Sequence, residues 1–240
     1  MKNMKKKVFA LALVVCLIAT VSVSTLAWFA ANDTVTNEFG IADSTDDANA
    51  VFSIDVYEMY DVDGDGDEDK DTDGIVYGAN NEVVPGAYLA KKAFVENTGK
   101  YDQYARVKVT LSDVSVWASM LGITDVQNAS FDLTEIFDVP AAFDTTWIRN
   151  DAETVFPTTG NDTLTYVFYY NGVLEADDAA VAFLEGVSIP EEMTRENVVA
   201  MGGGFTLAIV AEAVQATNVL DVYGTNEAAN ALASFAAVNS

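Results

Sequence analysis

The densest group of side chains that could do chemistry lies between residues 61 and 74, where the sequence reads DVDGDGDEDKDTDG. In a calcium loop, carboxylates at alternate positions converge on one hard cation and a glycine permits the sharp turn. Four residues fit positions 1, 3, 5 and 6 of such a loop: Asp61, Asp63, Asp65 and Gly66. We therefore expect Ca²⁺ to bind here, with six candidate ligands: Asp61, Asp63, Asp65, Asp67, Asp69 and Asp73.

The loop is not an EF-hand. Its position 12 is Thr72 instead of glutamate, and the flanking residues favour strands over helices. We expect a weak to moderate affinity, roughly 10⁻⁴ to 10⁻³ M, as is typical of extracellular modules. The alternative is a solvated acidic insertion between two strands that binds no ion.

Catalytic chemistry finds little support elsewhere in the chain. There is no histidine and a single cysteine, Cys16, so Ser-His pairs, Cys-His pairs and the usual zinc ligands are excluded. The glycines at 202–204 lack the lysine of a phosphate loop, and adjacent acids such as Glu191 and Glu192 are typical of a solvated turn. The aromatic residues within 166–170 could contact carbohydrate, although packing explains them more simply. We expect no enzymatic activity.

The first 27 residues have the layout of a secretory signal peptide. Four lysines within residues 2–7 precede an apolar run over residues 8–19, and a small-x-small cleavage site ends at Ala27. The apolar run is short for a membrane span of roughly 20 residues, although a retained anchor is the alternative. The sequence thus predicts export, processing by a signal peptidase, and a mature chain, residues 28–240, that begins at Trp28.

The exported part is strongly acidic. Removing four lysines from the 12 basic residues leaves 8 against 37 acidic ones, a formal net charge of −29. Nucleic acid is therefore a poor partner. The charge favours solubility and cation binding, and it makes self-association dependent on salt.

The remaining pattern is typical of an all-β protein. Alternating or continuous apolar segments predict strands at 51–60, 75–77, 104–111, 146–149, 164–170 and 205–216. Residues 83–88 combine a strand end with a turn at Pro85-Gly86. Asn171-Gly172 predicts a hairpin turn after one of them. Residues 117–121 could be helical, 131–137 could be either helix or strand, and 179–187 could form a short segment packed on the sheet. The alanine-rich stretch 226–237 predicts a C-terminal helix.

Short strands separated by turns, without a βαβ rhythm or a repeat, predict a single antiparallel β-sandwich domain. We expect a jelly-roll-like arrangement with short helical insertions.

Several segments in this order resemble the TasA/camelysin family of exported proteins from Gram-positive bacteria. They are TLAWF at 25–29, VPG at 84–86, VENTG at 95–99, ARVKV at 105–109, YYNGVL at 169–174 and AEAVQA at 211–216. The resemblance covers about residues 5 to 220, although each motif is short. It implies a dedicated signal peptidase and a jelly-roll subunit of a biofilm-matrix fibre.

The resemblance also implies that the N-terminal segment of one subunit, about residues 28–40 here, completes the sheet of the next. Strand addition satisfies unpaired backbone groups while side chains fill pockets. The candidate assembly residues are Trp28, Phe29, Val35, Phe39 and Ile41. The alternatives are a flexible N-terminus and an intramolecular first strand.

Camelysin relatives are described as metallopeptidases, but this chain lacks the histidines of a zincin site. We therefore expect a secreted structural subunit of an extracellular fibre or biofilm matrix, which self-associates and could join other matrix proteins. The alternative is a monomeric calcium-dependent adhesin or binding module at the cell surface.

Overall fold

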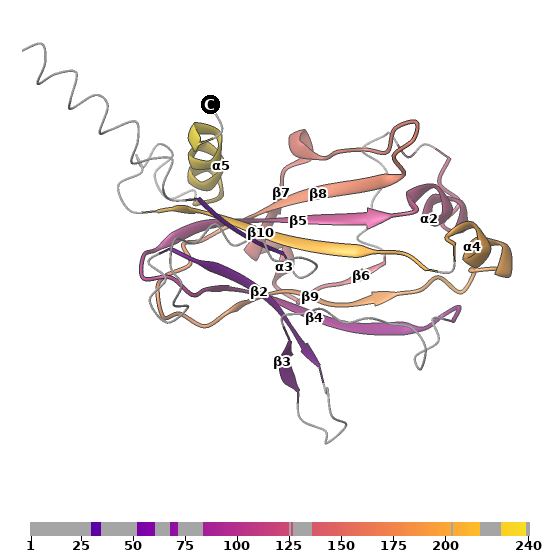
Figure 1. The fold of residues 1–240 in the computed structure, drawn as a ribbon, viewed down its shortest axis with the longest axis horizontal. Helices are drawn as coiled ribbons and strands as arrows, with labels where there is room; N and C mark the ends of the chain where they lie inside the picture. The colour runs from indigo at the N-terminus through magenta and orange to yellow at the C-terminus, as the bar shows by residue number, and fades with distance from the viewer. Residues whose placement is uncertain are drawn as a thin grey trace, which may run out of the picture.

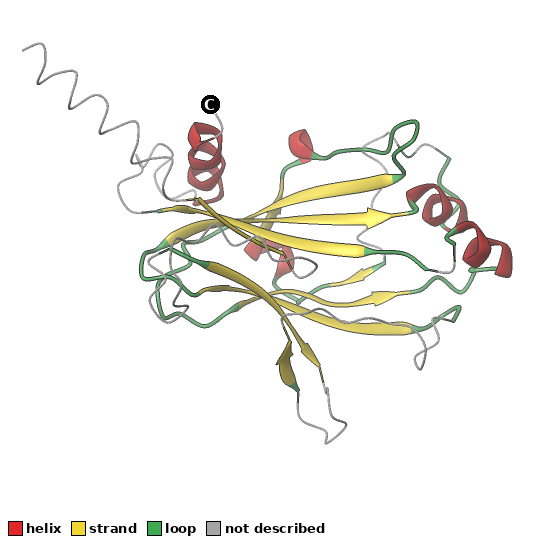
Figure 2. Ribbon diagram, in the orientation of Figure 1, coloured by secondary structure: helices red, strands yellow, loops and turns green. Residues whose placement is uncertain are grey.

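Two antiparallel sheets of five strands each lie face to face in the computed structural model (Figures 1 and 2). The structure describes residues 30–34, 52–60, 68–71, 84–124, 126, 136–202, 204–216 and 227–238. The prediction of an all-β antiparallel sandwich is confirmed.

The first sheet, sheet A, has the strand order β1-β10-β5-β8-β7. Its strands are β1 (Ala30–Thr34), β10 (Leu207–Gln215), β5 (Gln103–Ser112), β8 (Thr163–Tyr170) and β7 (Trp147–Arg149). The long strands β10, β5 and β8 alternate in side-chain direction. Their inward residues, such as Val107, Leu164 and Ile209, belong to the main core between the sheets.

The second sheet, sheet B, has the strand order β3-β2-β4-β9-β6. Its strands are β3 (Asp69–Asp71), β2 (Ile54–Tyr60), β4 (Tyr88–Asn97), β9 (Val181–Ser188) and β6 (Phe137–Asp138). Val56, Val95 and Phe183 are among its inward residues and pack against those of sheet A. The hairpin of β2 and β3 projects away from the body of the sandwich (Figure 1).

The described helices are short. They are α2 (Val114–Met120), α3 (Phe143–Thr146), the 3₁₀ turn η3 (Asp151–Glu153), α4 (Arg195–Ala200) and α5 (Glu227–Val238). The C-terminal helix α5 was predicted, and it packs on the outer face of sheet A, where Phe235 and Ala231 meet Tyr104, Tyr169 and Val214. Within the described residues, no helix is long and apolar enough to cross a membrane.

Two local predictions need correction. The segment at 179–187 is a full strand, β9, between β4 and β6 in sheet B. Asn171-Gly172 does not close a hairpin, because Leu174 pairs with Gln103 of β5 and the chain then crosses to the other sheet. Pairing with distant strands, which local propensity does not report, decided both. The turn predicted at Pro85-Gly86 is present, and β4 begins after it at Tyr88.

The VENTG segment fixes one end of the sandwich. Asn97 Nδ2 donates to the carbonyl oxygens of Tyr101 and Leu174 at 2.9 and 2.8 Å, and its Oδ1 accepts from Gln103 Nε2 at 2.7 Å. A Cβ on Gly99 would lie 2.7 Å from the backbone nitrogen of Ser53. The motif therefore ties the turn after β4 to the residues that lead into β2.

Candidate functional site

The edge of sheet A formed by β1 and β10 is the first candidate for assembly. β1 runs antiparallel to β10, from Ala30 opposite Val214 to Thr34 opposite Val210. On its other side, β10 pairs with β5 along all nine of its residues. The five residues of β1 therefore cover residues 210–214, in the C-terminal part of a longer strand, and they come from the N-terminal segment of the chain.

The other described edges of the sandwich are short or charged. β7 has three residues and β6 has two, and β3 reads Asp-Lys-Asp. Short and charged edge strands are common means of preventing unwanted strand pairing. Without β1, the mainly apolar β10, with nine residues, would be the longest of the edge strands that the structure describes.

The candidate assembly residues Trp28, Phe29, Val35, Phe39 and Ile41 lie outside the described residues, as does the predicted signal segment 1–27. The segment between them is described, and as β1 it pairs within its own chain. This is the intramolecular first strand that the sequence left open as an alternative.

Part of the acidic segment, residues 69–71, forms the strand β3. Tyr60 of β2 lies opposite Asp69, and Glu58 lies opposite Asp71. The predicted strand before the acidic segment is confirmed as β2, but β3 lies inside the stretch 61–74 that we expected to be a loop, because its backbone pairs with β2. The predicted strand at 75–77 lies outside the described residues.

Of the six predicted calcium ligands, only Asp69 is described, as an exposed residue of β3. The other five lie outside the described residues: Asp61, Asp63, Asp65, Asp67 and Asp73. Within the described part of the chain, no group of three or more potential metal ligands comes together.

Lysines neutralise the acids at the base of this hairpin. Lys70 Nζ lies 3.1 Å from Asp55 Oδ2, 2.7 Å from Glu96 Oε2 and 3.9 Å from the centre of the Tyr57 ring. Burial lowers the pKa of Lys70, but its hydrogen bonds to Glu96 and Asp55 outweigh this and raise the pKa overall. Lys92 contacts Glu68 in the same region.

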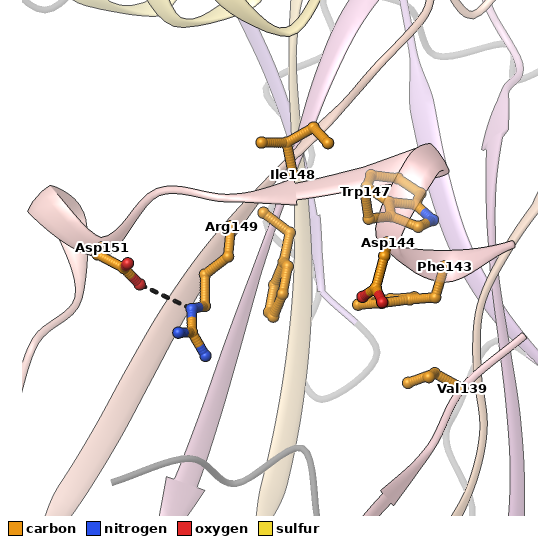
Figure 3. Close-up of a pocket in the computed structure, with 8 residues that line it drawn as sticks. Val139, Phe143, Asp144, Trp147, Ile148, Arg149 and Asp151 are labelled. Atoms are coloured by element: carbon orange, nitrogen blue, oxygen red, sulfur yellow. Dashed lines mark hydrogen bonds and ion pairs between the residues drawn. The ribbon is translucent and has the colours of Figure 1, made fainter. Parts of the chain in front are cut away.

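A hollow of about 640 Å³ opens beside α3 and β7, at the opposite edge of sheet A from β1 (Figure 3). Its apolar lining includes Phe143, Trp147 and Phe168, which are each at most 6% exposed because they pack on one another and on Phe183. Its charged lining consists of Asp144, Asp151 and Arg149, and Arg149 Nε donates to Asp151 Oδ1 at 2.7 Å. Sequence reasoning did not find this hollow, since its residues come from four separate elements, α3, β7, η3 and β8, and from the loop before α3.

A buried charged pair was also missed. Glu58 of β2 and Lys91 of β4 contact each other between the sheets. The signal was present in the sequence, because both residues occupy inward positions in the strand alternation, next to Val56 and Ala93.

Compared with known proteins, the chain matches no family model, no curated protein and no solved structure. The resemblance to the TasA/camelysin family therefore remains a prediction from the motifs.

Proposed function

We propose that this chain is an exported structural subunit of an extracellular fibre or biofilm matrix, whose N-terminal strand pairs with β10 of a neighbouring copy. The observation that carries the proposal is the position of β1, which comes from the N-terminal segment and covers the long apolar β10. A strand that covers β10 in its own chain can satisfy the same backbone groups in another copy.

The length of the intervening sequence supports such an exchange. Residues 35–53 separate β1 from β2 in the sequence, and an extended chain spans at most about 3.3–3.6 Å per residue. This allows a reach of roughly 60 Å, which is greater than the width of a small domain. An exchanged strand keeps its intramolecular hydrogen-bond pattern, so that the exchange needs little new interaction energy.

The strand order supports a jelly-roll arrangement. The first and last strands of the sandwich, β1 and β10, are neighbours, and β5 and β8 follow them in sheet A. The chain passes repeatedly between the two sheets, as in the double-sheet jelly rolls. Strand exchange at the first strand would then leave the rest of the sandwich unchanged.

Charge sets the conditions for assembly. The chain carries a formal net charge of −25 including the four lysines of the leader, so two copies repel each other at low ionic strength. We expect salt or millimolar Ca²⁺ to promote fibre formation.

Electron microscopy of the exported chain, purified with and without millimolar Ca²⁺, tests the proposal. We expect regular fibres, and we expect none from a chain that lacks residues 28–40. A matched pair of variants sharpens the test. Replacing both Ala31 and Asn32 with proline removes backbone donors from β1, whereas replacing both with serine retains them.

Fibres from the double-proline variant would refute donation of β1. Persistent monomers of the parent chain in both conditions would instead favour the second candidate, a calcium-dependent adhesin. The projecting acidic hairpin supports that candidate. Calorimetric titration with Ca²⁺ tests it, and replacing Asp61, Asp63 and Asp65 with asparagine should abolish the heat of binding.

A further inference from the structure

Glu58 and Lys91 place a carboxyl group and an amine together in the interior of the sandwich. The side chain of Glu58 is fully buried and that of Lys91 is 11% exposed. Lys91 Nζ donates a hydrogen bond to Glu58 Oε1. The carboxyl group and the amine are therefore in direct contact and largely shielded from water.

The strand pairing holds the two groups in place. Glu58 of β2 lies opposite Ala93 of β4, so Lys91, two residues before Ala93, is its diagonal neighbour on the same face. Diagonal neighbours lie about 7–8 Å apart, a distance that a glutamate and a lysine side chain span end to end. The pairing of β4 with β9 is irregular between Ala90 and Ala93, and such bulges redirect side chains.

The energetics of burial favour a neutral product. Each ion of a buried pair loses hydration free energy of several kcal/mol. The attraction between the two charges offsets this loss only when their geometry is good. An amide carries no charge and needs only hydrogen bonds. Burial also lowers the pKa of Lys91 to about 8, so the nucleophilic neutral amine is accessible near neutral pH.

We propose that Glu58 and Lys91 condense into an intramolecular amide that cross-links β2 to β4. A proton passes from the Lys91 ammonium to the Glu58 carboxylate, and the neutral Nζ attacks Cδ. The new bond joins Nζ to Cδ, the bond from Cδ to one carboxyl oxygen breaks, and this oxygen leaves as water with one proton from the acid and one from the amine. The reaction consumes no oxidant, reductant or further reactant.

Such a bond would give the exported chain a covalent cross-link between two strands. The one cysteine in the sequence is Cys16, within the predicted signal segment, so that the rest of the chain has no residue able to form a disulfide. The amide would fasten β2, which carries the acidic hairpin, to β4 near the middle of sheet B. This inference does not depend on fibre formation.

The mass of the intact, denatured exported chain tests the proposal. We expect it to be one water lighter than its sequence from the observed N-terminus. Lys91→Arg keeps the positive charge but replaces the amine with a non-nucleophilic guanidinium, so this variant should have its full mass. Lys92→Arg is the matched control, because Lys92 contacts Glu68 at the exposed surface, where both side chains are more than 40% exposed. This variant should retain the loss of water.

Digestion after lysine and arginine locates the bond. We expect a branched product that joins the peptide containing Glu58 to the one containing Lys91, with no cleavage after Lys91. A full mass for the folded wild-type chain, or the same loss of water in Lys91→Arg, would overturn the proposal. If Lys91→Arg does not accumulate as folded protein, the presence or absence of the branched peptide in the wild type decides. Because both measurements use denatured chain, a failure to form fibres does not affect them.

Discussion

Two clusters in this molecule each pair a cation with a carboxylate, in opposite settings. Between the sheets, the largely buried Lys91 contacts the fully buried Glu58. On the outer face of sheet A, Arg106 donates to Glu212 at 2.5 Å and to Tyr169 at 3.1 Å, and it lies 4.4 Å from the centre of the Phe235 ring.

The difference shows that the number of partners, as well as burial, decides the protonation of a buried cation. Burial dominates at Lys91 and lowers its pKa to about 8. At Arg106, burial also lowers the pKa, but hydrogen bonds and charges from Tyr169 and Glu212 outweigh it and raise the pKa overall. Arg106 therefore stays ionised and contacts Phe235 of α5, whereas Lys91 loses its proton near pH 8.

Breaking the inner pair should have the largest effect on stability. Lys91→Met leaves the carboxyl group of Glu58 buried without its amine, and we expect a loss of about 3–5 kcal/mol in the free energy of unfolding. Urea denaturation followed by circular dichroism measures it.

The double variant Glu58→Leu with Lys91→Met is the control, because it removes both polar groups and keeps the volume. It should recover the part of the loss that comes from the unpaired carboxyl group, but not the part that comes from the lost cross-link. A loss below about 1 kcal/mol in the single variant would show that water reaches the pair.

Breaking the outer cluster should cost less. Arg106→Met removes hydrogen bonds to Glu212 and Tyr169, but Lys108 remains 2.6 Å from Glu212 and continues to neutralise it. We expect a loss of about 2 kcal/mol in the free energy of unfolding. The matched variant Lys108→Met should lose about 1 kcal/mol or less, since Lys108 is more exposed. Equal losses in the two variants would contradict a central role for Arg106.

The outer cluster should also be visible in an alkaline titration. Burial raises the pKa of Tyr169 to about 12, although Arg106 opposes the shift. Between pH 10 and 12 the folded chain thus retains the Tyr169 proton, whereas the unfolded chain releases it. The contribution of Tyr169 to the free energy of unfolding therefore falls as the pH rises through this range. Ultraviolet titration of tyrosinate, with Tyr169→Phe as the reference, measures the pKa. Ionisation of Tyr169 near pH 10 in the folded chain would contradict the burial argument.

The smallest effect is expected at the hairpin. Lys70 bridges Asp55 and Glu96, but its side chain is 42% exposed, so that solvent screens both contacts. Lys70→Met should change the free energy of unfolding by about 1 kcal/mol or less in urea denaturation. A larger loss in the free energy of unfolding would show that this surface cluster stabilises the fold as strongly as the buried clusters do.

The candidate sites were only partly predictable. The acidic segment was recognisable because its composition is unusual over a short stretch, and the strand expected before it is confirmed as β2. The strand β3 inside the segment was not predicted, because it depends on pairing with β2. The charged pair of Glu58 and Lys91 did not stand out, although both residues fall on inward strand positions. Each residue alone reads as an ordinary charged residue of an exposed strand, and only their pairing identifies the site.

The sequence by itself determined the all-β class, the strands around 104–111 and 164–170, the C-terminal helix and the acidic character of the chain. These features depend on local alternation, propensity and composition, which a short window of residues contains. The tertiary structure alone decided that β9 lies between β4 and β6 in sheet B, that α5 packs on sheet A, and that Ala30 lies opposite Val214. Pairing between distant strands depends on which edges and faces the other strands of the sandwich leave available. No local sequence pattern specifies that choice.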